Sequence, residues 1–330
     1  MKELVECVPN FSEGRDEATI EAIVGAVRAV PGVKVLSAES DADYNRTVLT
    51  FVGSPRAVSQ GALACARACF EQIDMSEHHG GHPRLGALDV LPFVPVRGID
   101  INGAAALARA AAVSIADQLD VPVYLYGAAA ARPEFANLTK ARKGQYEALA
   151  QRLADPQQRP DFGPARFVPR FGAALVGARP FLIAYNVNLN CDDEELANEI
   201  ARRVRTSGYK REGERVPGML PEVKGMGVLL ETQGLAQVSM NLTDFRCTSM
   251  HKAFDTVREL ARERGADADG SELVGLAPLQ ALLDTAIHAG GSADEDQRRA
   301  VARAVEYLGL DRLGPFDPDK KVLELMLEDR

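Results

Sequence analysis

Residues 236–242 read AQVSMNL, and apolar and polar side chains alternate along the whole stretch. This two-residue period is typical of a β-strand with one buried face. Residues 181–189 and 223–230 are further strand candidates, and apolar side chains three or four positions apart predict helices over residues 196–204 and 254–261. The second half of the chain is therefore predicted to begin in the order β-α-β-β-α.

The first half predicts the complete order β-α-β-β-α-β, and we expect the second half to repeat it. Its strands are predicted at 4–8, 33–37, 47–52 and 87–96, and its helices at 20–27 and 58–70. Two such units predict an α/β fold, more closely an α+β sandwich, made of duplicated ferredoxin-like units with their helices on one sheet face. Similar halves also predict a ligand cleft between them.

The domain boundary is predicted near Ala178, which gives an N-terminal domain of residues 1–178 and a C-terminal domain of residues 179–330. Prolines are frequent between residues 133 and 180, so we expect an ordered linker there, with one helix over residues 140–153. Three further segments lie outside the repeated order: a long loop at 207–222 and two helices, at 294–308 and 320–327, that are expected to cap the second unit.

Composition excludes several classes of function. The 330 residues are 46% hydrophobic and 26% charged, with a net charge of -9 and no cluster of basic residues, so a nucleic-acid partner is not expected. The five cysteines are scattered and form no C-x-x-C pair, which favours a reducing cytoplasm over a disulfide framework. No apolar run is long enough to span a bilayer, and no export signal is visible at the amino terminus.

Three of the five histidines lie in the loop HHGGHPR, residues 78–84. A histidine on such a loop can accept and return a proton near neutral pH, and His82, between glycine and proline, is the strongest candidate. The alternatives are a solvated loop and a zinc site. The spacing of His78, His79 and His82 suits zinc only on a helix, which the two glycines argue against.

A second candidate cluster precedes the strand at 47–52. Glu39, Asp41 and Asp43, together with Arg46, can hold a cationic and an anionic substrate group, or can form a solvated turn. The Gly and the terminal Glu of a calcium-binding loop are absent.

Two loops add candidates. Asn10 and Ser12 lie on a strand-to-helix loop, where ligands often bind, although Ser12 can equally cap the helix. The segment DFGPARFVPRFG, residues 161–172, can stack on a planar ring and pair with a carboxylate, or can be a linker anchored by aromatic packing. His251 and His288 are expected to be structural. The chain has no dinucleotide-binding, Walker or nucleophile-elbow motif.

Several long strings carry a resemblance to one family. LVECVPNFSEG (4–14), NRTVLTFVG (45–53), HPRLGALDVLPFVPVRG (82–98), VPVYLYG (121–127) and PDFGPARFVPRFGA (160–173) resemble the formiminotransferase family, which includes the transferase part of formiminotransferase-cyclodeaminase. The resemblance covers nearly the whole chain and suggests a stand-alone transferase. It implies transfer of a formimino group from N-formimidoyl-L-glutamate to N5 of tetrahydrofolate in histidine degradation. Tetrahydrofolate is then the acceptor substrate, no metal is needed, and a cytoplasmic homodimer is expected.

The resemblance and the chemistry of the residues together give site assignments. His82 is expected to be the catalytic acid–base group, with Arg46 and the carboxylate of Glu39 beside it, and Asp41 is an alternative to Glu39. Gly81 stands where mammalian relatives have Glu. Substrate binding is assigned to Asn10, Asn45 and Arg84. Folate binding is assigned to Gly163, Pro164, Ala165, Arg166, Phe167, Val168, Pro169, Arg170, Phe171 and Gly172.

Two other classes of function stay open at the level of sequence. One is a non-catalytic protein of the same fold that binds folate or another small molecule. The other is a metal-dependent hydrolase acting on an amidine. The sequence also leaves open whether a formyl donor is accepted and whether polyglutamate tails are preferred.

Overall fold

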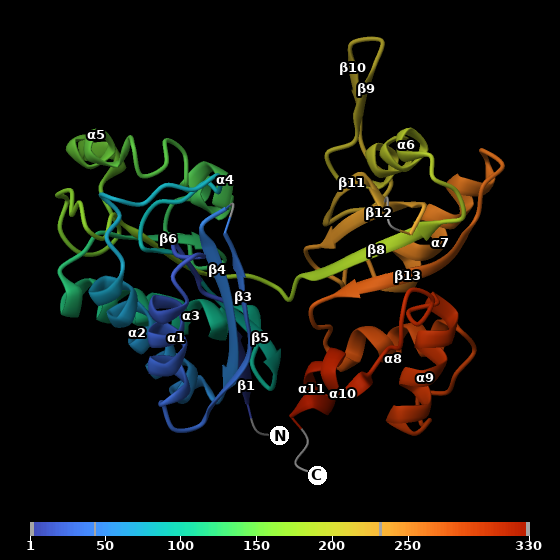
Figure 1. Cartoon of the computed structure of the whole chain (residues 1–330), viewed down its shortest axis with the longest axis horizontal. Helices are drawn as coiled ribbons and strands as arrows, with labels where there is room; N and C mark the ends of the chain where they lie inside the picture. Colours follow the sequence, from blue (N-terminus) through green and yellow to red (C-terminus); the bar gives the residue numbers. More distant parts are fainter. Residues whose placement is uncertain (1–2, 43, 231–232, 328–330) are drawn as a thin grey trace. The chain divides into compact units, whose positions relative to one another are not determined.

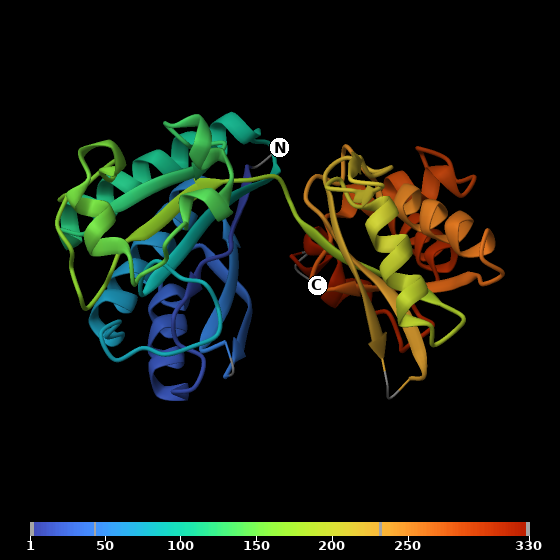
Figure 2. The ribbon, with the colours of Figure 1, turned by 90° about the horizontal axis from the view of Figure 1, so that it is seen from above.

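The computed structural model describes residues 3–42, 44–230 and 233–327. The chain divides into two compact units, Met1–Pro180 and Phe181–Arg330, each with its own sheet and helices (Figures 1 and 2). Ala178, near which the sequence predicts the boundary, is the last residue of β7 (Ala174–Ala178), the last strand of the first unit.

The sheet of the first unit has seven strands. Two short strands, β1 (Leu4–Cys7) and β2 (Asn10–Phe11), follow one another and both lie antiparallel between β4 (Arg46–Gly53) and β5 (Leu88–Arg97). On one side β3 (Val33–Asp41) pairs antiparallel with β4, and on the other β7 and then β6 (Val123–Gly127) extend the sheet in parallel from β5. With α1 (Glu17–Arg28) and α2 (Pro55–Gln72), the predicted β-α-β-β-α-β order is confirmed.

Three helices pack on one face of this sheet (Figure 1). Asp16 caps α1, and Ser54 followed by Pro55 starts α2, as helix N-termini prefer. A third helix, α3 (Ile101–Leu119), was not predicted. Its buried face consists of alanines and Ile115, which let the helix backbone come close to the sheet.

Over β5, β6 and β7 the opposite face is covered by the segment that follows β6, which the sequence predicted to be a linker. It contains η1 (Pro133–Ala136), α4 (Leu138–Ala141), α5 (Leu149–Ala154) and η2 (Pro156–Gln158). The single helix predicted over 140–153 is wrong, because Gly144 and Gln145 have φ angles of 86° and 55°, which no right-handed helix accepts. Tyr124 and Leu149 form part of a second core on this face.

The second unit has a four-stranded antiparallel sheet in the order β11 (Val223–Leu230), β12 (Leu235–Leu242), β8 (Ile183–Leu189), β13 (Ala268–Val274). With α6 (Glu194–Val204) and α7 (Met250–Arg262), it repeats the β-α-β-β-α-β order of the first unit, as predicted. The alternation in β12 is confirmed: Ala236, Val238, Met240 and Leu242 are all buried.

The segment 207–222 was predicted to be a loop and instead contains a hairpin. Its strands are β9 (Tyr209–Arg211) and β10 (Glu214–Val216). Glu212 and Gly213 join them with φ angles of 53° and 87°, the pair of positive values that a tight two-residue hairpin turn needs.

The tail of the chain is helical, with α8 (Leu279–His288), α9 (Gln297–Leu308), α10 (Pro318–Lys321) and α11 (Leu323–Met326). The helix predicted at 294–308 begins later, after its cap Asp296. The helix predicted at 320–327 is two short helices, because Val322 is extended and bridges to Ala277. In the part of the chain that the structure describes, no helix has both the length and the apolar character needed to cross a membrane.

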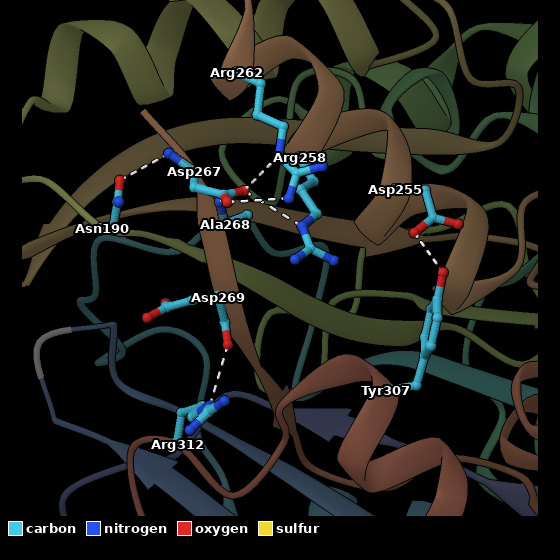
Figure 3. Close-up of polar contacts among 9 residues, drawn as sticks. All are labelled: Asn190, Asp255, Arg258, Arg262, Asp267, Ala268, Asp269, Tyr307 and Arg312. Carbon is cyan, nitrogen blue, oxygen red and sulfur yellow. Dashed lines mark hydrogen bonds and ion pairs between the residues drawn. The ribbon is translucent and has the colours of Figure 1, made fainter. Parts of the chain in front are cut away.

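Polar contacts fix the helices of the second unit to its sheet (Figure 3). The Asp267 carboxylate, at the start of β13, accepts hydrogen bonds from Arg258 and Arg262 near the end of α7. Tyr307 in α9 donates to Asp255 in α7 over 2.8 Å. His251 and His288 stack with ring centroids 4.3 Å apart, and His288 contacts Asp255, so both histidines belong to this network between helices.

Candidate active site

Asn45 holds the histidine loop in place. It lies just before β4 in the left-handed region, at φ 49°, a conformation that asparagine tolerates better than most residues. Its Oδ1 accepts from the Gly14 N–H over 2.9 Å, its Nδ2 donates to the His79 carbonyl over 3.0 Å, and its own carbonyl contacts Nε2 of His78 over 3.0 Å. Both ends of the amide are therefore engaged by backbone, and Asn45 positions the loop rather than facing a ligand freely.

Gly80 explains why the loop needs glycine. A Cβ at this position would lie 2.3 Å from the Tyr44 carbonyl oxygen, far inside contact distance. The loop can therefore approach the turn before β4 only with glycine there.

His78 and Arg84, two further residues of the histidine loop, already have polar partners within the first unit. His78 is buried, and its Nδ1 accepts from Nε of Arg84 over 3.4 Å, so His78 serves the packing of the loop. Arg84 is also buried and forms a 2.7 Å ion pair with Glu147. The structure thus matches the charge of Arg84 with a carboxylate of this chain. His79 is exposed.

His82 is different from its neighbours. The ring is half-buried, lies edge-on to Tyr44 at 5.9 Å, and has a buried Nδ1 that finds no hydrogen-bond partner among the described residues. Burial, then the charges of Arg46 and Arg142, lower its pKa to about 4. The imidazole is therefore neutral at physiological pH and able to accept a proton.

Asp89 and Arg142 are site residues that sequence reasoning missed. Asp89 is an extra residue in β5, at a bulge opposite β2, and only 2% of it is exposed. Its carboxylate accepts from the Leu85 N–H over 2.9 Å and from Arg142 Nη2 over 2.8 Å. Burial raises the pKa of Asp89 to about 6, although Arg142 and Arg46 oppose the rise. The signal in the sequence was a lone carboxylate in the apolar run LDVLPFVPV.

Arg46 begins β4 and is half-buried, with a buried Nε that has no partner among the described residues. Burial lowers its pKa, and Asp89 and Asp41 act in the opposite direction. No ion pair involves Arg46 in the part of the chain that the structure describes. Its guanidinium is thus a cation with unused hydrogen-bonding capacity close to His82.

The two candidate carboxylates lie on the same face of the sheet edge as Arg46. In the register of β3 and β4, Asp41 is opposite Arg46, and Glu39 is opposite Val48, one pleat further along. Both are exposed. Asp41 Oδ1 accepts from the Tyr44 N–H over 2.8 Å, whereas the Glu39 carboxylate has no hydrogen-bond or ion-pair partner among the described residues. Asp43, the third carboxylate of the predicted cluster, lies outside the described residues.

Asn10 and Ser12 lie near this face. Asn10 is opposite Val48 of β4, is buried, and donates to the Val8 carbonyl over 2.8 Å. Ser12 donates to the Gly86 carbonyl over 2.8 Å. The alternative that Ser12 caps the first helix is wrong, because Asp16 accepts the hydrogen bond from the Ala18 N–H.

The segment 163–172 is irregular and packs along the edge of the first unit. Phe171 is completely buried against Phe70, so its ring cannot stack on a ligand while the core is intact. Phe167 is half-buried and lies 5.4 Å from the ring of Tyr146. Of the aromatic side chains assigned to folate, Phe167 is therefore the one with an accessible surface.

The remaining positions of this segment are mostly at the surface. Gly163, at φ 80°, approaches the Val121 carbonyl so closely that a Cβ would lie 2.1 Å from it. Arg166 pairs with Asp120, and Arg170 donates to the Glu71 carbonyl over 2.8 Å; both arginines are exposed. Pro164 and Val168 are half-buried, Ala165 and Pro169 are exposed, and Gly172 is buried at φ 75°.

The histidine loop is also a candidate metal site. Within residues 3–42, 44–230 and 233–327, no three histidine, cysteine or acidic side chains are grouped so that they could hold a metal ion. The Nε2 atom of His78 already contacts the Asn45 carbonyl over 3.0 Å.

Comparisons with known proteins identify the family of the chain. The family described as "Formiminotransferase domain, N-terminal subdomain" matches residues 4–179, and "Formiminotransferase domain" matches residues 184–328. Formimidoyltransferase-cyclodeaminase of Mus musculus is 46% identical over 333 residues, and the match covers 100% of this chain but 61% of that protein. This chain therefore spans less than two thirds of the length of that bifunctional relative.

Shorter relatives match along most of their length. Glutamate formimidoyltransferase of Streptococcus pyogenes serotype M1 is 41% identical, with 87% of this chain and 93% of that protein covered. The protein of the same name from Thermoplasma acidophilum is 42% identical, with 86% and 91% covered. The chain belongs to the formiminotransferase family.

Proposed function

We propose that this chain transfers the formimino group of N-formimidoyl-L-glutamate to N5 of tetrahydrofolate, a step in the degradation of histidine to glutamate. Family membership and the names of the Streptococcus and Thermoplasma relatives support the proposal. The observation that carries it is the state of His82: a neutral imidazole with an unpartnered buried nitrogen, next to two guanidinium groups.

His82 suits the proton transfers of this reaction. When a nitrogen attacks the amidine carbon, it must lose a proton, and the glutamate nitrogen must gain one before it leaves. The low pKa keeps the His82 imidazole unprotonated and so available as the base, and it makes the imidazolium that forms a strong acid, which readily returns a proton to the leaving nitrogen. One residue can therefore serve both half-steps.

The charged groups around His82 fit the donor. The formimino group carries a positive charge that Glu39 or Asp41 can hold, which keeps the amidine carbon electrophilic. Arg46 has free hydrogen-bonding capacity for a glutamate carboxylate. Arg142 is fixed by Asp89 and contributes its charge without leaving that pair.

We assign the acceptor to the segment 163–172, as in the sequence prediction, with one change. Phe167 is proposed to contact a ring of the folate, and Arg166 or Arg170 its glutamate carboxylates. Phe171 is not proposed to touch the ligand, because it lies in the core.

The test is a spectroscopic assay with the purified chain, N-formimidoylglutamate and tetrahydrofolate. We expect 5-formiminotetrahydrofolate to form together with an equal amount of glutamate. Glutamate released without folate would instead indicate a hydrolase, and folate binding without either product would indicate a binding protein. Formylglutamate in place of the donor measures whether a formyl group is accepted.

Location and assembly belong to the same proposal. We infer a cytoplasmic homodimer that acts on small molecules and binds no nucleic acid. The net charge of -9 argues against a nucleic-acid partner, and the scattered free cysteines favour the cytoplasm. The homodimer is proposed from the resemblance to the family alone. Sedimentation of the purified chain measures the oligomeric state.

A further inference from the structure

The sheet of the second unit has one apolar and one polar face. Side chains such as Tyr185, Val187 and Val238 are buried on the face where α6 and α7 pack. Because successive strand residues point to opposite faces, Asn186, Asn188 and their cross-strand neighbours lie on the other face. The face opposite the helices is therefore polar.

Three cross-strand rows form this polar face. The central row is Met226, Ser239, Asn186 and Glu272, from β11 to β13. On one side of it lie Val228, Gln237, Asn188 and Gly270, and on the other Lys224, Asn241, Ala184 and Val274. Three amides, Asn186, Asn188 and Gln237, and the carboxylate of Glu272 thus meet above strands β8, β12 and β13.

Gln237 joins these groups into one cluster. Its Nε2 donates to Asn188 Oδ1 over 2.7 Å and to Glu272 Oε2 over 3.2 Å. Its Oε1 accepts from Asn186 Nδ2 over 3.3 Å. Gln237 is 2% exposed and is fully used within the cluster, so its role is to orient the other three side chains.

Two of the oriented side chains, Asn188 and Glu272, keep unused hydrogen-bonding capacity. Asn188 is 2% exposed, and its Nδ2 is buried without a hydrogen-bond partner among the described residues. An unpaired buried donor is unfavourable, because it loses its hydrogen bonds to water without replacement, and folds normally avoid it. Glu272 is half-buried, and the hydrogen bonds that it accepts within the described residues all reach Oε2, which leaves Oε1 available.

We propose that Asn188 and Glu272, oriented by Gln237, form a subsite for the edge of a planar heterocycle that presents N–H donors beside a carbonyl. A carboxylate takes two parallel N–H donors, and a neighbouring amide N–H takes the carbonyl. Given the proposed function, the matching ligand is the pterin of the folate acceptor, whose edge carries an amino group, a ring N–H and a carbonyl in that order.

The chemistry distinguishes the pterin from the formimino donor. An amidinium also presents two N–H donors to a carboxylate, but it has no acceptor for the Asn188 N–H. The carboxylates of the donor would supply an acceptor but would be repelled by Glu272. Only a group with donors and an acceptor along one edge satisfies both side chains.

The floor and rim of the face suit a flat ring. Ala184 and Ser239, the neighbours of Asn186 along β8 and across to β12, have short side chains, which leaves room above the strands there. Met226 and Val274 stand at the rim, 60% and 45% exposed, and offer apolar and thioether contacts to an aromatic ring.

Arg312 borders the subsite at its Asn188 end. Its aliphatic stem lies where a Cβ of Gly270 would be, with Cγ 2.6 Å from that point, and its Nε donates to the Asp269 carbonyl over 3.2 Å (Figure 3). The side chain is exposed, so it can move when a ring enters.

The experiment compares ligands with and without the pterin. Isothermal titration measures binding of 5-formyltetrahydrofolate and of p-aminobenzoylglutamate, which lacks the ring, to the wild type, Glu272→Gln and Asn188→Asp. Asn188→Asp keeps the acceptor for Gln237 and loses the free donor. Asn241→Asp, an amide at the exposed end of the same face, is the matched control.

We expect both cluster variants to bind the pterin-containing ligand about 10- to 100-fold more weakly, the loss that follows from one charge-assisted hydrogen bond. Binding of p-aminobenzoylglutamate should not change, and Asn241→Asp should match the wild type. Thermal unfolding identifies a variant that fails to fold, and the other variant then decides.

Failure of this inference and of the proposed function can be told apart. Wild-type transfer activity with unchanged pterin affinity in both variants would remove the subsite and keep the function. Pterin binding that depends on Glu272 in a chain without transfer activity would keep the subsite and remove the function. A wild type that binds no pterin at all would overturn the subsite.

Discussion

Replacement of Arg142 by Met should destabilise the first unit in a way that grows with pH. Asp89, its partner, is 2% exposed and has its pKa raised from 3.8 to about 6. The folded state therefore binds more protons than the unfolded state between these values, and stability falls as pH rises through this window. Above pH 6 the stability that the wild type loses through Asp89 levels off at about 3 kcal/mol, because each pKa unit between the unfolded and folded values corresponds to about 1.4 kcal/mol.

Without Arg142, Asp89 loses the largest influence that opposes this rise and stays protonated to higher pH. The extra electrostatic cost should then be close to zero at pH 5 and should grow by at most about 1.4 kcal/mol for each pH unit above 6, until the pH reaches the higher pKa of Asp89 in the variant. Loss of Arg142 also eases protonation of His82, which favours the variant further at low pH. The packing lost with the Arg142 side chain destabilises the variant by a further amount that does not depend on pH.

Hydrogen exchange of peptides from β5 measures the local free energy of opening at pH 5, 7 and 8 after correction for intrinsic rates. Arg152→Met is the matched control, because Arg152 is buried in the same segment, donates to the Ala141 carbonyl and has no ion pair with a described carboxylate. The decrease in the free energy of opening caused by Arg152→Met should be the same at all three pH values. An equally flat loss for Arg142→Met would refute the assignment of the cost to the Asp89 charge.

Three further outcomes are expected. His82→Ala should lose about 10²–10⁴-fold in turnover with normal folding, and His79→Ala far less; near wild-type turnover of the first variant would remove His82 from the chemistry. Only one of Arg166 and Arg170 is expected to contact the folate tail. Its replacement by Ala should weaken folate binding by about 1.5–3 kcal/mol and leave binding of the donor unchanged. Titration of both variants with a folate and with N-formimidoylglutamate measures this. Activity should survive chelation, and elemental analysis should find no stoichiometric metal; activity lost on chelation and restored by zinc would contradict this.

Element order was predictable because it depends on local periodicity. The alternation of residues 236–242 and the apolar stripe of α6 each report directly which face is buried. α3 escaped because alanines occupy both its buried and its exposed faces, so hydrophobicity hardly varies around the helix. The break between α4 and α5 escaped because it depends on the backbone angles of Gly144 and Gln145, which a helical pattern does not reveal.

The candidate site was predictable only where its residues share a loop. His82 and Arg46 each stand in a dense polar motif and attracted attention for that reason. The Asp89–Arg142 pair joins positions 53 residues apart, and Arg142 stands in a segment that the prolines made resemble a linker. A carboxylate in an apolar strand needs a buried cation, so Asp89 signalled that a partner exists without revealing which one.

The position of His82 depends on residues that carry out no chemistry. Asn45 ties the loop at Gly14 to the loop at His79, and the glycines at 14 and 80 let both backbones approach it closely. A cluster of polar groups held this way costs stability, as the unpartnered nitrogens of His82 and Arg46 indicate. A reaction that moves protons between two nitrogens needs that unused capacity, because a histidine already paired at both nitrogens, like His78, has none to offer a substrate.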